Sequence, residues 1–312
     1  YDARNSRYFG DDAMTLKERL DIYEKLMRLD KPIGILLLLW PTLWGLWLSS
    51  QGSPNALALV VFILGVVLMR SAGCVVNDIA DRDFDPYVER TKDRPLAARL
   101  IPVREAWYVA GVLIFLSFLL VLALNALVIK LAAVALAVAL VYPYLKRWFW
   151  LPQAWLGIAF AMGIPMAFAT HQNRIVALAW VLVLANVFWA IAYDTEYAMV
   201  DREDDIKLGL KSSAIWFGRF DVAAVMVCHT LFLGCLAYVG LRAQCGVAFF
   251  AGLIAAALIV AYQYLLICER RRENCFRAFM LNNFLGGVIW IGIVAEFLFR
   301  IPLFPLAAGL AR

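Results

Sequence analysis

The chain has 312 residues, of which 64% are hydrophobic and 17% charged, and its formal net charge is +5. Its mean hydropathy of +0.76 excludes an ordinary soluble domain, which has no use for so much apolar surface. The positive charge does not indicate nucleic-acid binding, because it follows from lysines and arginines gathered on one side of the predicted membrane spans.

Residues 1–30 are predicted to form a cytoplasmic segment that contains an amphipathic helix. Between Thr15 and Leu29, apolar residues recur at helical spacing beside lysines and arginines. Such a helix is expected to lie on the inner membrane surface. No cleavable signal peptide is expected, since polar and charged residues precede the first long apolar run. Residues 31–312 are predicted to form a single transmembrane domain.

Runs of about 20 apolar residues predict membrane-spanning helices. Nine spans are expected, at 33–50, 55–76, 106–124, 126–144, 152–170, 175–197, 222–240, 246–268 and 279–299. If these spans alternate in direction, 23 of the 29 lysines and arginines fall on one side, which should be cytoplasmic. The predicted fold class is therefore an all-α integral membrane protein with nine transmembrane helices.

Acidic residues recur along the stretch 73–85, which begins at the end of the second predicted span. If a helix continues through it at about 100° per residue, one face carries Asn77, Asp78, Asp81 and Asp85. Carboxylates this close repel one another, so a cation should lie between them. Hard oxygen ligands without His or Cys favour Mg²⁺, which fills its other positions with water and substrate phosphate. These four residues are thus candidate metal ligands, and Pro86 should end the helix at Asp85.

Two basic segments follow on the same predicted side. The loop 89–96 contains Arg90, Lys92 and Arg94, which suit either a solvated surface or diphosphate contact. The fourth span ends near Lys146 and Arg147 among aromatic residues. Such a positive end is ordinary at an inner interface, but Arg147 also suits recognition of a planar carboxylate substrate.

A second acidic stretch, 193–205, corresponds to the first. On a helical count Asp194, Asp201 and Asp205 lie within about 40° of one another. Asn77 precedes Asp201 by 124 residues, and Asp81 precedes Asp205 by the same 124. The matching offsets predict a site built between two similar halves of the chain.

Together these residues resemble the UbiA family of intramembrane prenyltransferases. The resemblance is carried by Asn77-Asp78-x-x-Asp81-x-x-x-Asp85, Arg90-Thr91-x-x-Arg94-Pro95 and Tyr193-Asp194-Thr195-x-Tyr197-Ala198-Met199-x-Asp201-x-x-Asp204-Asp205. The branch that it is most similar to, bacterial 4-hydroxybenzoate polyprenyltransferases, is indicated by Asp30-Lys31-Pro32-Ile33-Gly34, Trp40-Pro41-Thr42, Tyr142-Pro143 and Lys146-Arg147. The resemblance extends from about Leu26 to the ninth predicted span. Ala97-Ala98-Arg99 departs from the small, Gly-containing version expected in the loop.

The resemblance implies a bundle around a central cavity, in the inner membrane of a bacterium, with the site loops in the cytoplasm. The implied reaction joins a polyprenyl group from polyprenyl diphosphate to 4-hydroxybenzoate, ortho to its hydroxyl, in ubiquinone biosynthesis. Mg²⁺ would be held by Asn77, Asp78, Asp81, Asp85, Asp201 and Asp205, and the diphosphate by Asn77, Lys92, Arg94 and Lys146. Arg147 would bind the aromatic acid, and Asp201 or Asp194 would polarise the phenol. No obligate protein partner is expected.

Several alternatives stay open. Other acceptors, namely dihydroxynaphthoate, homogentisate or haem, would use the same reaction type. A divalent-cation transporter also has intramembrane acids, but these would be distributed along a path rather than gathered at one mouth. A phosphotransferase acting on CDP-alcohols would need a D-G-x-x-A-R signature, which this sequence lacks. A non-enzymatic scaffold would not need two phased acidic faces.

Overall fold

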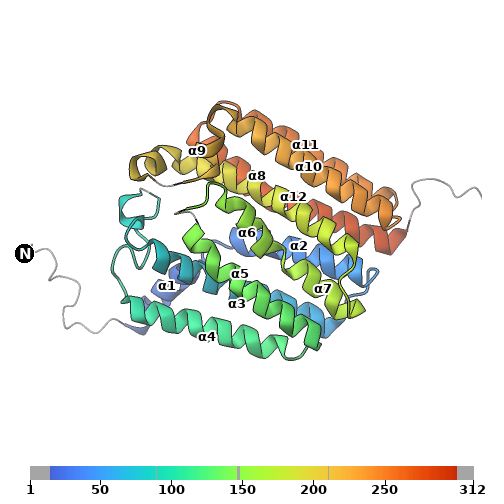
Figure 1. The fold of residues 1–312 in the computed structure, drawn as a ribbon, viewed down its shortest axis with the longest axis horizontal. Coiled ribbons are helices and arrows are strands. Elements are labelled where there is room, and N and C mark those ends of the chain that lie inside the picture. Colours follow the sequence, from blue (N-terminus) through green and yellow to red (C-terminus); the bar gives the residue numbers. More distant parts are fainter. Residues whose placement is uncertain (1–14, 89, 146–147, 210, 301–312) are drawn as a thin grey trace, which may run out of the picture.

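The protein is helical throughout the part of the chain that the structure describes. The computed structural model describes residues 15–88, 90–145, 148–209 and 211–300, and these form helices without a strand. The long helices run side by side along one axis, and α1, the loop after α3 and α9 lie at the same end of the bundle (Figure 1). The prediction of an all-α fold is confirmed.

The long helices follow the predicted spans closely. They are α2 (Ile33–Ser49), α3 (Ala56–Asp81), α4 (Val103–Val121), α5 (Ala126–Leu145), α6 (Pro152–Ala161), α7 (Gly163–Gln172), α8 (Ala177–Leu208), α10 (Asp221–Arg242), α11 (Val247–Ile267) and α12 (Arg272–Phe299). Within the described ranges, eight segments are long and apolar enough to cross a membrane, with α6 and α7 together making one of them. The predicted first span is the shorter apolar helix α2, which has 17 residues. The protein is thus a multi-pass membrane protein, and the count of nine stays a prediction.

The predicted fifth span is divided between α6 and α7 at Met162. Pro165 contributes to this break, because a proline nitrogen cannot donate to the carbonyl four residues earlier. Gly163 permits α2 to approach closely, since a Cβ there would lie 2.2 Å from the Oγ1 atom of Thr42. The break therefore brings α2 against the middle of the bundle.

The core centres on buried aromatic residues where α2, α8 and α10 meet. Trp189 stacks on Phe232 with 5.5 Å between ring centroids, and Trp44 lies 5.3 Å from Trp189. Asn282 of α12 accepts a 2.8 Å hydrogen bond from Trp189 Nε1 and donates a 2.8 Å hydrogen bond to the buried Glu196. These bonds tie α8 to α12 and fix which face of α8 turns away from the core.

Four helices lie outside the predicted spans: α1 (Leu16–Met27), η2 (Asp85–Tyr87), α9 (Ser213–Phe217) and η3 (Gly218–Phe220). A capping box between Thr15 and Glu18 begins α1. Ile22 and Leu26 are buried in a cluster with residues of α3, whereas the more N-terminal leucines of α1 are exposed. Its position at the membrane surface remains a prediction.

The prediction that the helix continues to Asp85 is wrong, because the helix ends four residues earlier. α3 stops at Asp81, a turn follows in which Phe84 N donates to Asp81 O at 2.8 Å, and Asp85 begins η2. Pro86 explains the break, because it lacks an amide hydrogen and disfavours helical geometry at the residue before it.

Candidate active site

A cavity of about 1020 Å³ lies inside the bundle. Its lining includes Arg28 at the end of α1 and Arg90, Thr91 and Arg94 of the loop after α3, and α1 and this loop lie at one end of the bundle (Figure 1). The end of the cavity beside α1 and this loop, called the mouth below, is lined by charged residues from both halves of the chain. The remainder is lined by apolar side chains of α3, α4, α5 and α7. The cavity thus joins a charged mouth to a long apolar compartment.

The first acidic stretch supplies one wall of the mouth. Asn77, Asp81 and Asp85 line the cavity, and Asn77 Nδ2 donates to Asp81 Oδ2 at 3.0 Å. Asp78 is 1% exposed, and its Oδ1 accepts hydrogen bonds from Arg28 at 2.5 Å and from Arg94 at 3.2 Å. Asp78 therefore holds two arginines in place, and its predicted role as a metal ligand stays a prediction.

The loop after α3 is folded back onto Asp85. Arg94 Nη1 donates to Asp85 Oδ2 at 2.8 Å, and Thr91 Oγ1 donates to the Asp85 backbone carbonyl at 2.9 Å. Burial raises the pKa of the Asp85 carboxyl, and the Arg94 guanidinium opposes that rise. Lys92 is exposed in this loop. Of the two cations in this loop that the family resemblance assigns to the diphosphate, Lys92 and Arg94, it is Arg94 that lines the cavity.

The second acidic stretch supplies the opposite wall. It lies within the continuous helix α8, so its helical spacing is preserved, and Asp194, Asp201 and Asp205 all line the cavity as their phase predicted. The intervening Glu203 points elsewhere and accepts a 3.0 Å hydrogen bond from Arg272. The structure thus brings the two predicted acidic groups to one cavity.

Two arginines at this cavity, Arg28 and Arg70, were not predicted as site residues, and a third, Arg90, was predicted only as one of the loop cations that suit diphosphate contact or a solvated surface. Arg28 enters from the C-cap of α1, where it adopts the left-handed conformation with φ of 56°. Arg90 crosses from the loop after α3 to Asp201, and Arg70 lies deeper, on α3. Arg70 precedes Asn77 by seven residues, which is two helical turns, and this spacing could have placed it on the same face.

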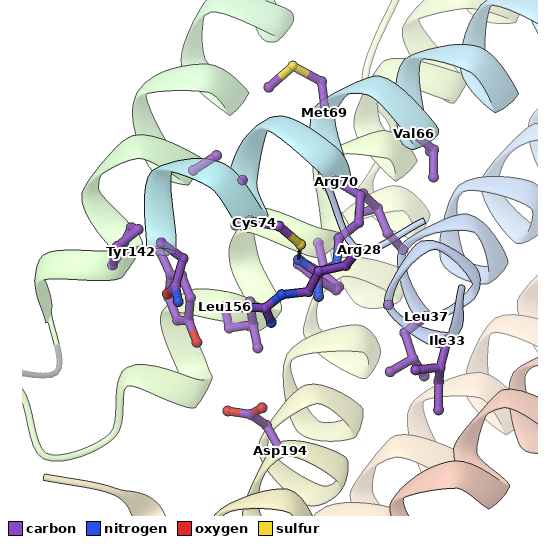
Figure 2. Close-up of a pocket in the computed structure, with 18 of the residues that line it drawn as sticks. Arg28, Ile33, Leu37, Val66, Met69, Arg70, Cys74, Tyr142, Leu156 and Asp194 are labelled. Carbon is purple, nitrogen blue, oxygen red and sulfur yellow. Dashed lines mark hydrogen bonds between the residues drawn. The ribbon is translucent and has the colours of Figure 1, made fainter. Parts of the chain in front are cut away.

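Arg70 faces the middle of the cavity. Its Nη1 donates to Cys74 Sγ at 2.6 Å, its guanidinium lies 5.8 Å from the centroid of the Phe160 ring, and its buried Nε has no hydrogen-bond partner among the described residues. Figure 2 shows Tyr142 and Asp194 facing the same space as Arg70. Within the described ranges, Arg70 forms no ion pair with a carboxylate. Arg70 is thus available to an anionic ligand.

Two predicted site residues, Lys146 and Arg147, lie outside the described residues. Their predicted contacts with diphosphate and with the aromatic acid stay predictions. The described end of α5 places Tyr142 and Pro143 in the cavity wall.

The donor atoms at the mouth fit a hard divalent cation. All candidate ligands are carboxylate or amide oxygens, and they come from α3, η2 and α8 on facing walls. Among the described residues, no three His, Cys, Asp or Glu side chains converge into a complete metal site. A Mg²⁺ ion here would need oxygen atoms from a phosphate and from water to complete its shell, which is its usual mode of binding.

The charges and shape of the cavity suit a molecule with an anionic head and a long apolar tail. Arg28, Arg90 and Arg94 surround the mouth, and guanidinium groups bind phosphate oxygens through paired hydrogen bonds. The apolar compartment beyond them can take a hydrocarbon chain and keep water out. Arg70 can bind a second, smaller anion.

Comparison with known proteins gives the same family on several measures. The model of the UbiA prenyltransferase family matches residues 38–285. The chain is 58% identical over 285 residues to a 4-hydroxybenzoate octaprenyltransferase of Azoarcus sp. (strain BH72), covering 91% of this chain and 99% of that protein. It is 56% identical over 287 residues to a protein of the same name from Nitrosomonas europaea, covering 92% of this chain and 98% of that protein.

Solved structures share the fold. The apo structure of a UbiA homolog from Aeropyrum pernix K1 aligns with a TM-score of 0.75 at 25% identity, over 84% of this chain and 97% of that one. A UbiA homolog from Archaeoglobus fulgidus bound to GPP and Mg²⁺ aligns with a TM-score of 0.65 at 19% identity, over 89% of this chain and 98% of that one.

Proposed function

The chain belongs to the UbiA prenyltransferase family, and from this premise we propose that it prenylates 4-hydroxybenzoate. The enzyme transfers a polyprenyl group from polyprenyl diphosphate to the aromatic ring, ortho to the hydroxyl, and releases diphosphate, in ubiquinone biosynthesis. The observation that carries the proposal is the single cavity that joins two facing acidic walls and several arginines to a long apolar compartment. A cation transporter would not need that compartment.

The polyprenyl diphosphate binds with its diphosphate group at the mouth and its hydrocarbon tail inside the cavity. Arg28, Arg90 and Arg94 bind and orient the diphosphate at the mouth, while the isoprenoid tail lies along the apolar compartment. Mg²⁺, held by Asn77, Asp81, Asp85, Asp201 and Asp205, supplies charge stabilisation to the departing diphosphate when it is bound. The all-oxygen donor set supports this choice of metal.

The residues deeper in the cavity serve the acceptor. Arg70 pairs with the carboxylate of 4-hydroxybenzoate, and the phenol is directed to Asp194. Arg70 and Asp194 face the same space in the cavity (Figure 2). Asp194 accepts a hydrogen bond from the phenol and increases electron density on the ring. Arg147, which the sequence favoured for the carboxylate, remains the alternative to Arg70.

Bond breaking and bond making then follow in order. The carbon–oxygen bond to the diphosphate breaks, and the electron pair leaves with the diphosphate. The allylic cation is stabilised by aromatic faces, for which Tyr142, Phe160 and Tyr193 line the cavity. The ring carbon ortho to the hydroxyl attacks, and the proton on that carbon is lost to restore aromaticity. Exclusion of water by the apolar walls protects the cation from hydrolysis.

The location proposed for the protein is a bacterial inner membrane with the mouth in the cytoplasm. Most lysines and arginines of the described residues lie at the mouth end, in α1, in the loops and in the adjoining helix ends, which is the distribution that the positive-inside rule associates with the cytoplasmic side.

One assay tests the function. Membranes that contain the protein are incubated with a polyprenyl diphosphate, Mg²⁺ and a panel of 4-hydroxybenzoate, dihydroxynaphthoate, homogentisate and haem, and the product masses are measured. We expect prenylated 4-hydroxybenzoate as the main product. A product formed mainly from another acceptor would refute the acceptor assignment, and no Mg²⁺-dependent product from any acceptor would refute the reaction.

A further inference from the structure

Arg90 links the two halves of the chain across the mouth. It lies in the loop after α3, and its Nε donates to Oδ1 and Oδ2 of Asp201 on α8 at 3.1 and 2.9 Å. Its Nη2 donates to Asp201 Oδ2 at 2.5 Å. Both carboxylate oxygens of Asp201 therefore face a guanidinium group from the other half.

Tyr197 holds the guanidinium in this place from a second side. The Arg90 guanidinium lies 4.3 Å from the centroid of the Tyr197 ring, and Arg90 Nη1 donates to the Tyr197 hydroxyl. Tyr197 precedes Asp201 by one helical turn, so the ring and the carboxylate lie on one face of α8. All three residues line the cavity.

This arrangement conflicts with simple metal binding at Asp201. A divalent cation bound to this carboxylate would lie beside a guanidinium that already contacts both of its oxygens, and like charges at such a distance repel. The metal and Arg90 are therefore competitors for one carboxylate.

We propose that Arg90 alternates between two anionic partners, Asp201 and the diphosphate of the donor, and that diphosphate binding thereby releases Asp201 to the metal. The inference rests on the proposed function, because it assumes that the mouth binds diphosphate and a divalent cation. To the diphosphate contact already proposed for Arg90 it adds control of when Asp201 is free to bind the metal.

The surroundings of Arg90 favour an exchange made by its side chain. The loop is fixed beside it by Thr91 and Arg94, which both bond to Asp85. The Arg90 side chain is 31% exposed, so its guanidinium can reach an anion in the mouth while its flat face remains on Tyr197. An arginine that turns over an aromatic ring keeps its cation–π contact in both positions.

The exchange makes metal and diphosphate binding cooperative. Each ligand removes the obstacle to the other, because diphosphate draws Arg90 from Asp201 and the metal occupies the carboxylate that Arg90 leaves. Such coupling is reciprocal by thermodynamic necessity. Loss of Arg90 should therefore strengthen the binding of metal alone and weaken the binding of diphosphate.

The experiment measures the two ligands separately on detergent-purified, metal-free protein. Mn²⁺ is titrated without diphosphate, and free Mn²⁺ is read by electron paramagnetic resonance. Retention of ³²P-labelled inorganic diphosphate is measured at saturating Mg²⁺. For Arg90→Gln we expect Mn²⁺ affinity to rise roughly tenfold or more and diphosphate affinity to fall roughly tenfold or more, the ratio that corresponds to ~1.4 kcal/mol in each case. A purely structural role would lower both affinities.

Arg104 offers a matched control on α4. Its Nε and Nη2 donate to the Tyr108 hydroxyl at 3.1 and 2.9 Å, and its guanidinium lies 5.5 Å from that ring, so it reproduces the arginine–tyrosine contact outside the cavity. Arg104→Gln should leave both affinities at wild-type values. The double variant Arg90→Gln with Asp201→Asn should lose the gain in Mn²⁺ affinity.

The outcomes separate this inference from the proposed function. If the wild-type protein retains diphosphate but Arg90→Gln binds Mn²⁺ no more tightly, the exchange is refuted and the function stands. If the gain in Mn²⁺ affinity persists in the double variant, the metal binds elsewhere and the exchange is again refuted. If wild-type protein retains no inorganic diphosphate at any Mg²⁺ concentration, the exchange is refuted, while the proposed function is decided by the product assay. Arg90→Lys keeps the positive charge but loses the two-pronged guanidinium, so it should shift both affinities in the same directions as Arg90→Gln but by less. If Arg90→Gln does not fold, an unchanged Mn²⁺ affinity in Arg90→Lys refutes the exchange.

Discussion

Neutralising Arg70 should selectively impair use of an acceptor that carries a carboxylate. In Arg70→Gln the cavity keeps nearly its shape, but the acceptor loses a charge-assisted contact. Such contacts contribute about 1.5–3 kcal/mol, which corresponds to a KM for 4-hydroxybenzoate about 10- to 150-fold higher. The KM for the polyprenyl diphosphate should change little, because Arg28, Arg90 and Arg94 remain at the mouth.

A neutral acceptor makes the comparison specific. Initial rates of prenyl transfer are measured for 4-hydroxybenzoate and for 4-hydroxybenzamide, which keeps the phenol but lacks the charge. We expect Arg70→Gln to reduce the preference for the acid over the amide by the same factor. If the variant slows both acceptors equally, or leaves the KM for 4-hydroxybenzoate unchanged, the assignment of Arg70 is refuted. Arg147→Gln in the same assay tests the alternative.

Gly34 provides a second perturbation of the same contact without a change of charge. A Cβ at Gly34 would lie 2.5 Å from both Nε and Nη2 of Arg70, so Gly34→Ala must displace the guanidinium. We expect a smaller rise in the KM for 4-hydroxybenzoate in this variant than in Arg70→Gln. Arg82→Gln is the control, because Arg82 is half-exposed and pairs with Asp83 outside the cavity.

Three further predictions concern the mouth, the core and the N-terminal helix. Asp205→Asn should abolish turnover in a protein that still folds and inserts, and activity retained by this variant would contradict the metal assignment. Asp83→Asn is the control, because Asp83 is exposed, and it should keep its activity. Asn282→Ala removes the hydrogen-bond acceptor of the buried Trp189 N–H and one hydrogen-bond donor to the buried Glu196. An unsatisfied buried group costs about 1–3 kcal/mol, so the thermal unfolding midpoint should fall, and an unchanged midpoint would show that the pairing is not stabilising. The Tyr23 hydroxyl donates a hydrogen bond to Glu105, and this bond raises the pKa of Tyr23. The bond therefore contributes to the free energy of unfolding below the ordinary tyrosine pKa of about 10, and the contribution is lost as the pH rises through the raised pKa. The difference in unfolding midpoint between wild type and Tyr23→Phe should therefore be constant near pH 8 and vanish in strong alkali.

The predicted spans and the second acidic group were accessible to sequence reasoning because both depend on local regularity. Apolar runs of membrane-spanning length must form helices in lipid, where backbone groups have no water to bond. Asp194, Asp201 and Asp205 lie on one continuous helix, so counting at about 100° per residue places them correctly on the cavity wall. Their offset from the first group also indicated a site between two parts of the chain.

Helical counting failed at Asp85, where the helix had already ended. Asp85 lines the cavity because η2 and the Thr91 and Arg94 contacts return the loop to the mouth, not because it continues the face of α3. A periodicity argument holds only while the backbone remains helical, and a turn before Pro86 removes its basis.

The sequence by itself determined that the chain lies in a membrane, that it is helical, which family it belongs to and which acidic residues group together. Each of these depends on composition or on spacing within one segment. Only the tertiary structure decided which cations accompany those acids. Arg28 meets Asp78 across 50 residues of chain, and Arg90 meets Asp201 across 111. A long, flexible side chain can reach any of several carboxylates, and the choice among them depends on how loops and helices from both halves pack around one cavity.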